Sequence, residues 1–473
     1  MHVHLVGVAG TGMGTLAGLL KAAGHRVTGS DTAFYPPMGE ALARYGVETR
    51  TGFDAAHVAD RPDLVVVGNV CRKDNPEARA AIDGGLPHSS MAGALETMFL
   101  AERPGFVVAG THGKTTTTTL LAYLLDRTGR DPGLFVGGIP KDFAESFRLG
   151  GARAPFVLEG DEYDSAFFEK SPKFWRYRPW ATILTSIEHD HIDIYPDEAS
   201  YLAAFEGLVE RIPADGVLVA WAGDPKVRQV AARARCRVVF YAVSGEDTGE
   251  VTPTWLAAPM LAQGGAQPFE LFVGGTSAGR ILSPLMGVHN VKNATAAMAL
   301  ACETSEGRTT IAELSAALRG FRGIKRRQEL LAEAGGVRVY DDFAHHPTAV
   351  KETLSALRAR HPEGKLVAVF EPRSATASRN LHQADYAESF YDAGAVVLAP
   401  VGRKNIPEAE RLDVAAIAGA LAGKGIDAVA PADLEAVEAA ILARAAPGDT
   451  VLIMSNGDFG GLYDRLIARL ARR

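Results

Sequence analysis

The feature that most constrains the fold is a repeated pattern of short apolar runs that alternate with helical stretches. One run, at 2–8, leads through a glycine loop into a helix, and similar runs occur at 64–68, 106–110 and 450–456. Strands that are apolar on both faces are typical of parallel sheets covered by helices on each side. The pattern therefore predicts an α/β fold with mostly parallel sheets.

The chain of 473 residues is long enough for about three domains of ordinary size. The pattern is interrupted at Arg103-Pro104-Gly105 and again at 320–323. We therefore predict a Rossmann-like N-terminal domain at 1–100, a central domain at 101–322 and a Rossmann-like C-terminal domain at 323–473. Sheets of this kind bind ligands at the carboxyl ends of their strands, so we expect nucleotide-type sites at the sheet edges.

Composition narrows the functional classes. A net charge of −7 argues against a broad surface for nucleic acid or anionic membranes. No stretch of about 20 apolar residues is present that would insert into a membrane. The three cysteines, Cys71, Cys236 and Cys302, are far apart and form no CxxC pair, which argues against a disulfide scaffold or a structural zinc site. We expect a cytoplasmic protein.

The segment 110–117 reads GTHGKTTT, follows an apolar run and opens a helical stretch. Glycines allow backbone N–H groups to surround a phosphate, a lysine adds positive charge, and a threonine hydroxyl can bind Mg²⁺. The first glycine of the usual loop is replaced by Val108, so this is a shortened variant. The alternative is a glycine turn before a threonine-rich helix. Spacing and both flanking elements favour a phosphate-binding loop with Lys114 and Thr115 in these roles.

Acidic and histidine side chains follow two further apolar runs. Glu159 and the acids of 161–164 follow one, and Glu188-His189-Asp190-His191 follow the other. At the ends of strands such groups can reach a metal bound to neighbouring phosphates. The alternatives are an exposed acidic loop for the first group and a structural histidine for the second.

The N-terminal loop at 7–12 suits a diphosphate at the start of a helix, although a dinucleotide fingerprint would have glycine in place of Ala9. Asp31, after the next run, is placed to accept ribose hydroxyls. A tight strand–helix turn is the alternative. Ala9 also argues against an NAD-dependent dehydrogenase.

Three later segments are candidates for ligand contacts. The segment 287–294 begins an alanine-rich helix, where Asn293 could pair with an adenine edge or the segment could simply cap the helix. The segments 342–347 and 370–374 end apolar runs with paired histidines and an arginine, which suggests side chains that face a ligand.

Taken in order, these segments resemble the Mur ligase family of ATP-dependent amide-forming enzymes over essentially the whole chain. The motifs that carry the resemblance are GTHGKTTT at 110–117, the acidic strand end at Glu159, the Asp190-His191 pair, GVHNVKNA at 287–294, GIKRRQE at 323–329 and DDFAHHP at 341–347. Many members carry a carbamoylated lysine in the helix after the Asp-His pair. The matching stretch at 201–206 has no lysine, as in members that use UDP-N-acetylmuramate.

The resemblance implies ATP and Mg²⁺ as cofactors, with Lys114, Glu159 and His191 as catalytic residues. Thr115, Glu159 and His191 would bind metal. The implied ATP-binding residues are Gly110, Thr111, His112, Gly113, Lys114, Thr115, Thr116, His289, Asn290, Asn293, Arg326 and Asp342.

The resemblance also implies that the first domain binds a UDP-sugar and the third binds a peptide. The implied UDP-sugar contacts are Ala9, Gly10, Gly12, Met13, Ser30, Asp31 and Asn69. The implied peptide contacts are His345, Arg373, Arg379, Ser455 and Asn456. We expect a monomer or a weak homodimer.

Two branches of the family fit, and both start from UDP-N-acetylmuramate. One adds L-alanine, and the other adds a recycled tripeptide, L-alanyl-γ-D-glutamyl-meso-diaminopimelate, in peptidoglycan recycling. The alanine-adding branch usually has serine where Tyr163 stands and a His-Arg pair near Pro372. The tripeptide branch is favoured by the segments 35–38, 68–69, 161–168, 370–374 and 455–457. A non-catalytic nucleotide sensor is the alternative from another class.

Overall fold

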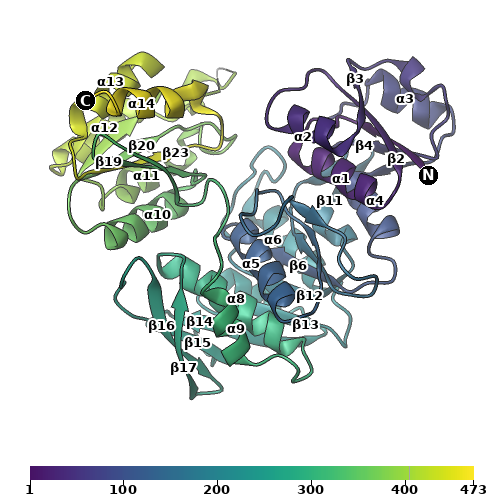
Figure 1. Ribbon diagram of the computed structural model, residues 1–473, viewed down its shortest axis with the longest axis horizontal. Helices are drawn as coiled ribbons and strands as arrows, with labels where there is room; N and C mark the ends of the chain where they lie inside the picture. Colours follow the sequence, from purple (N-terminus) through teal and green to yellow (C-terminus); the bar gives the residue numbers. More distant parts are fainter. Residues whose placement is uncertain (404) are drawn as a thin grey trace.

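The computed structural model describes residues 1–403 and 405–473, and it has three α/β units (Figure 1). Each unit contains one larger sheet, of five, ten or six strands. The first unit (purple) and the third (green to yellow) each lie against the central one (blue to green). The predicted α/β fold with three mostly parallel sheets is therefore confirmed.

The first unit is a fully parallel sheet in the order β3-β2-β1-β4-β5. Its strands are β1 (His2–Val6), β2 (Arg26–Asp31), β3 (Glu48–Thr51), β4 (Leu64–Val67) and β5 (His88–Ser90). Its helices are α1 (Thr11–Ala22), α2 (Met38–Tyr45), α3 (Pro76–Asp83) and α4 (Met91–Met98). The strand order reverses between β1 and β4, so the loops after these two strands form the crevice where such sheets bind ligands.

The central unit has the order β17-β16-β15-β14-β13-β12-β6-β9-β7-β8. Its strands are β6 (Gly105–Ala109), β7 (Gly133–Phe135), β8 (Phe147–Arg148), β9 (Phe156–Glu159), β12 (Pro179–Leu184), β13 (Val217–Trp221), β14 (Arg237–Val243), β15 (Trp255–Pro259), β16 (Gln267–Val273) and β17 (Thr276–Ser283). Its helices are α5 (Lys114–Arg127), α6 (Glu198–Val209), α7 (Pro225–Ala231), α8 (Val288–Glu303) and α9 (Ile311–Leu318). A separate hairpin joins β10 (Asp164–Ala166) to β11 (Glu169–Pro172).

The third unit has the order β18-β19-β23-β20-β21-β22, parallel except for β18 against β19. Its strands are β18 (Glu329–Ala334), β19 (Val337–Asp342), β20 (Leu366–Phe370), β21 (Ala395–Leu398), β22 (Asp427–Val429) and β23 (Thr450–Met454). Its helices are α10 (Pro347–Arg360), α11 (Gln383–Ser389), α12 (Val414–Gly423), α13 (Leu434–Arg444) and α14 (Leu462–Leu470).

Two connections join the units in sequence. The first runs from the end of α4 to β6, and the second runs from the end of α9 to β18. These connections contain the predicted boundaries near 100 and 322, which stay predictions. The second connection is held against the central unit, because Lys325 N–H donates to the carbonyl of Ile139 and Lys141 N–H donates to that of Gly323, both at 3.0 Å.

Helix α5 is the structural support of the central unit. Its residues from Thr115 to Leu125 are all buried, and it packs against α8, whose alanines allow the two helix backbones to approach closely. Burial of a leucine side chain stabilises a fold by about 1.5–3 kcal/mol. This packing fixes the start of α5, and with it the loop that precedes the helix. No helix in the described part of the chain is both long and apolar enough to span a bilayer.

We expect Leu124→Ala to destabilise the central unit by about 2–5 kcal/mol, because it removes a fully buried side chain of α5 from a packed core. Hydrogen exchange of the strands β6 and β12 is the appropriate measurement, since three units need not unfold in one transition. The control is Leu381→Ala, which removes a side chain that is 56% exposed. Equal protection in the two variants would contradict this description of the core.

Candidate active site

The candidate site lies at one edge of the central sheet. Strands β9, β6 and β12 are neighbours and run parallel, so their carboxyl ends lie at the same edge. Glu159 ends β9, the glycine loop at 110–113 follows β6, and the segment 188–191 comes shortly after β12. Three segments that the sequence singled out separately therefore converge.

The loop at 110–113 is tightly fixed. Gly110 has φ +132° and Gly113 has φ +77°, conformations that other residues rarely adopt. Thr111 N–H donates to the Ser186 carbonyl at 2.8 Å, and the Thr111 hydroxyl donates to the Glu188 carbonyl at 2.9 Å. The loop leads directly into α5, whose free N–H groups and dipole favour an anion at this position.

Lys114 lies in a buried network of charges. Its ammonium group donates to the Gly110 carbonyl at 2.6 Å and to Glu162 Oε1 at 3.1 Å. Burial opposes the charge of Lys114, but the carboxylates of Glu162, Asp161 and Glu159 outweigh this effect and raise its pKa. Lys114 is therefore held as a cation at the start of α5, as phosphate binding requires.

Glu162 is the residue whose importance sequence reasoning missed, although it stands in the acidic stretch. Its side chain is fully buried, and its Oε1 lies 3.0 Å from Nε2 of His191 and 3.2 Å from the Tyr201 hydroxyl that donates to it. The sequence shows two consecutive acids, Asp161 and Glu162, shortly after an apolar run. Nothing in their spacing shows which of the two side chains points into the protein. Glu162 positions Lys114 and His191 relative to one another.

Thr115 and Glu159 form an oxygen-rich pair. The Thr115 hydroxyl donates to Glu159 Oε1 at 2.6 Å, and Gly137 N–H donates to Glu159 Oε2 at 2.7 Å. Hydroxyl and carboxylate oxygens at this spacing are the ligand type that Mg²⁺ prefers. The chemistry of the donor set thus fits a magnesium ion beside the phosphate loop.

His191 has both ring nitrogens engaged. Nε2 faces Glu162, and Nδ1 lies 2.8 Å from the Tyr163 hydroxyl. Burial opposes protonation of His191, but the hydrogen bond and charge of Glu162 outweigh it and raise its pKa. Metal binding by His191 requires it to exchange one of these partners, so its role as a metal ligand stays a prediction.

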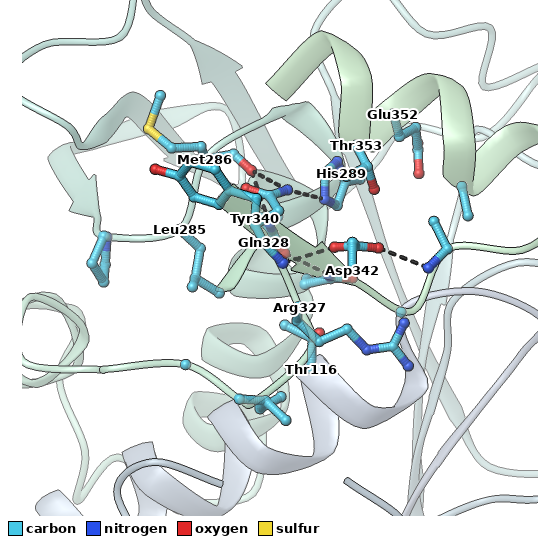
Figure 2. A pocket seen from close by; sticks show the side chains of 18 of the residues that line it. Thr116, Leu285, Met286, His289, Arg327, Gln328, Tyr340, Asp342, Glu352 and Thr353 are labelled. Atoms are coloured by element: carbon cyan, nitrogen blue, oxygen red, sulfur yellow. Dashed lines mark hydrogen bonds between the residues drawn. The ribbon is translucent and has the colours of Figure 1, made fainter. Parts of the chain in front are cut away.

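A cavity of about 310 Å³ lies between the central and third units (Figure 2). Seven of the residues that we predict to contact ATP line it: His112, Gly113, Thr116, His289, Asn290, Asn293 and Asp342. The cavity begins at the phosphate loop and reaches the carboxyl end of β19. It has the position expected for a nucleotide whose phosphates lie against the start of α5.

Polar groups of this cavity are held by local hydrogen bonds. Asp342 accepts from the N–H groups of Gln328 (2.7 Å) and Ala344 (2.8 Å), as Figure 2 shows. Asn293 donates to Asn290 Oδ1 at 3.1 Å, and its own oxygen packs against Gly113. Burial raises the pKa of Asp342. These side chains are therefore fixed in place around the cavity wall.

Arg326, which we predict to contact ATP, does not line this cavity. It donates to Asp341 at 3.0 Å and to the carbonyls of Ser455 and Gly457 at 2.7 Å, within the third unit. The neighbouring Arg327 lines the cavity instead and donates to the Thr115 hydroxyl at 3.4 Å. The sequence offered two adjacent arginines and no means of choosing between them.

The residues predicted to contact a UDP-sugar gather at the crevice of the first unit. Ala9 N–H donates to Asp31 Oδ2 at 2.9 Å, so the loop after β1 and the end of β2 are joined. Ser30 donates to the buried Glu77, and Met13 is buried on α1. Gly10 and Asn69 are exposed in the loops after β1 and β4, and Gly12 lies partly exposed in the first turn of α1.

The residues predicted to contact a peptide separate into two groups. Ser455 donates to Glu371, and Arg373 donates to Asp458 at 2.8 Å, while Asn456 follows β23 beside them. His345 lies in the loop between β19 and α10, with Nδ1 at 3.0 Å from the Phe343 carbonyl. Arg379 turns away from both, toward the carbonyl of Ala375 and Glu410.

Family models match nearly the whole chain. The model described as the Mur ligase family, catalytic domain, matches residues 2–103, the Mur ligase middle domain matches 108–301, and the Mur ligase, glutamate ligase domain, matches 326–457. The chain belongs to the Mur ligase family. As a Mur ligase it is an ATP-dependent ligase, which decides against the nucleotide sensor and the dehydrogenase considered from the sequence.

Individual relatives of this Mur ligase cover its full length. It is 36% identical to the UDP-N-acetylmuramate–L-alanyl-γ-D-glutamyl-meso-2,6-diaminoheptandioate ligase of Escherichia coli K12, over 100% of this chain and 99% of the relative. It is 34% identical to the UDP-N-acetylmuramate–L-alanine ligase of Roseiflexus sp. RS-1, over 97% of each. The crystal structure of a murein peptide ligase from Psychrobacter arcticus 273-4 matches with 34% identity and a TM-score of 0.71, over 100% of this chain and 99% of that one.

We expect Gly110→Ala to weaken ATP binding by at least about tenfold, since strained backbone of this kind costs about 1–3 kcal/mol. A methyl group there would lie 2.1 Å from the Thr185 hydroxyl and under 3 Å from the backbone of Ser186. Calorimetric titration with a non-hydrolysable ATP analogue measures the loss. The control is Gly419→Ala on α12, where nothing lies within 4 Å. Unchanged affinity in Gly110→Ala would show that the loop does not hold the nucleotide.

We expect Glu162→Gln to lower kcat by about 100-fold, because Lys114 loses the carboxylate that positions it and small misplacements are costly in catalysis. The same change should lower the pKa of His191, since the Glu162 charge is what holds it up. Steady-state kinetics and an NMR titration of the imidazole measure the two effects. Glu333→Gln, on the exposed edge strand β18, is the control. Normal turnover with a normal His191 titration would remove Glu162 from the site.

Proposed function

We propose that this ligase joins L-alanyl-γ-D-glutamyl-meso-diaminopimelate to the lactyl carboxylate of UDP-N-acetylmuramate. Two kinds of support exist. The Escherichia coli relative carries the name of this activity, the Psychrobacter arcticus structure is that of a murein peptide ligase, and both match the chain from end to end. The L-alanine ligases match at nearly the same identity, so the choice of acceptor depends on the residues of the third unit.

The arrangement around Arg373 is the observation that carries the acceptor assignment. The guanidinium lies 2.8 Å from Asp458 and 3.9 Å from Glu371, and its side chain is 44% exposed. A cation between two acids complements a group that bears both a carboxylate and an ammonium. The far end of meso-diaminopimelate is such a group, whereas free L-alanine carries both of its charges on the one α-carbon that bears the reacting amine.

The reaction proceeds in two steps. The lactyl carboxylate attacks the γ-phosphorus of ATP, which gives an acyl phosphate and releases ADP. The free amine of the acceptor then attacks the acyl carbon, the amide bond forms, and phosphate leaves with loss of one proton from the amine. Lys114 faces the phosphates and neutralises the negative charge that develops on the group in transfer.

A magnesium ion fits beside the phosphate loop. Thr115 and Glu159 would hold it, with His191 as the predicted further ligand. Bound there, the ion would supply positive charge that offsets the repulsion of ATP and the carboxylate. Glu162 keeps Lys114 as a cation and, together with Tyr163, orients the His191 ring.

The sugar nucleotide belongs to the crevice of the first unit, where the loops after β1 and β4 meet at the reversal of strand order. Ala9, Gly10 and Gly12 would face its diphosphate at the start of α1, and Asn69 approaches from the loop after β4. We further propose a cytoplasmic enzyme that acts as a monomer or a weak dimer.

We expect ATP-dependent phosphate release with the tripeptide and UDP-N-acetylmuramate, and a much lower kcat/KM with free L-alanine. Arg373→Ala should raise the KM of the tripeptide by about tenfold to a hundredfold, the range for losing a charged hydrogen bond, and leave that of ATP nearly unchanged. Phosphate release with each acceptor, at saturating ATP and sugar nucleotide, is the measurement.

The matched control is Arg472→Ala, an exposed arginine beyond the far end of α14. If L-alanine has the higher kcat/KM, the acceptor assignment fails and the enzyme belongs to the alanine-adding branch. The ATP chemistry would survive that outcome.

A further inference from the structure

A cluster of two histidines and one glutamate joins the central unit to the third. His112 comes from the phosphate loop, Glu188 from the loop after β12, and His346 from the start of α10. One ligand atom from each lies within 4.8 Å of the other two. No step of the proposed reaction uses these three side chains together.

The carboxylate of Glu188 lies close to both histidine rings. Nε2 of His112 lies 3.1 Å from Glu188 Oε2, and Nδ1 of His346 lies 3.4 Å from the same oxygen. Zinc–ligand bonds of about 2.0–2.2 Å place neighbouring ligand atoms roughly 3.3–3.6 Å apart in a tetrahedron. The 3.4 Å separation falls within this range, whereas the 3.1 Å separation is that of a hydrogen bond between His112 and Glu188, which a metal ion would replace.

His346 provides the second, independent observation. Its side chain is 8% exposed, and neither ring nitrogen makes a hydrogen bond within the described residues. Its Nδ1 nevertheless lies 3.4 Å from Glu188 Oε2, on the side of the ring that faces the cluster. Burying a polar group without a partner is costly, and a cation between the ring and the carboxylate would give His346 one.

The surroundings resemble the outer shell of a metal site. The Thr348 hydroxyl donates to Glu188 Oε2 at 2.8 Å, which orients the carboxylate. The ring of His382 lies edge-on to His346 at 4.8 Å, and its Nδ1 is 2.9 Å from Asp385. The Thr348 hydroxyl is a hydrogen-bond partner of the kind that fixes the direction of a metal ligand, whereas His382 contacts His346 only through its ring.

We propose that His112, Glu188 and His346 bind a Zn²⁺ ion that clamps the phosphate loop to the C-terminal unit. Two imidazoles and a carboxylate are a recurrent zinc ligand set, and a water or a phosphate oxygen would complete the tetrahedron. The site differs in chemistry from the oxygen pair of Thr115 and Glu159, which suits magnesium. Zinc bound here restrains the movement of the third unit relative to the loop that holds ATP.

Calorimetric titration of the full chain with zinc chloride, in buffer that contains excess MgCl₂, tests the site. We expect one Zn²⁺ per chain and, with cobalt chloride, the visible absorption of a four-coordinate Co²⁺ centre. Loss of an outer-shell partner alone weakens metal binding by about 10–100-fold. His346→Ala removes a ligand itself, so we expect it to lower the zinc affinity by at least about 100-fold. Glu188→Gln keeps the side-chain shape and serves if His346→Ala does not fold.

The matched control is His361→Ala, which removes a histidine of the same unit that pairs with Tyr340 instead. It should retain zinc affinity and the cobalt spectrum. In the unaltered chain, zinc should slow hydrogen exchange of both segments that it joins, 110–113 and 344–348. The proposal is overturned if the unaltered chain does not bind zinc, if His346→Ala and Glu188→Gln bind as tightly as it does, or if only one segment is protected.

Discussion

The buried pairing of Lys114 with Glu162 is the interaction on which the rest of the site depends. A lysine at the start of α5 repels the dipole of that helix and loses its hydration, so an anion must lie beside it. Glu162 supplies that charge and also faces His191. Because strands β9, β6 and β12 are adjacent and parallel, this one pair fixes the phosphate loop relative to the acids on both sides of it. The arrangement follows from the order of the strands.

Much of this could be read from the sequence, since the periodicity of apolar runs and the glycine loop have few structural solutions. The predicted ends of the strands β1, β6 and β23 differ from the observed ends by no more than two residues. The unbroken apolar character of these strands predicts a parallel sheet. The loop at 110–117 was recognisable because its residues are consecutive and their chemistry requires that order.

The rest depends on contacts between distant segments, which a single sequence does not encode locally. Nothing near Glu162 distinguishes it from its acidic neighbours until β12 and α6 surround it. Arg326 and Arg327 are adjacent and identical in type, and only the packing of β18 against β19 turns one inward and the other toward the cavity. The pairing of Arg373 with Asp458 spans 85 residues and likewise appears only in the fold.

The connection between the central and third units is a point about which the third unit could rotate. The fixed end is at 323–325, where backbone hydrogen bonds hold the chain against the loop around Lys141. Arg327 lies two residues after this connection in the chain, whereas Arg373 lies in the loop after β20. A rotation of the third unit about this connection would displace Arg327 less than Arg373. If Arg327 contacts ATP and Arg373 the peptide, as proposed, the enzyme would retain ATP during a movement that opens and closes the site of the peptide.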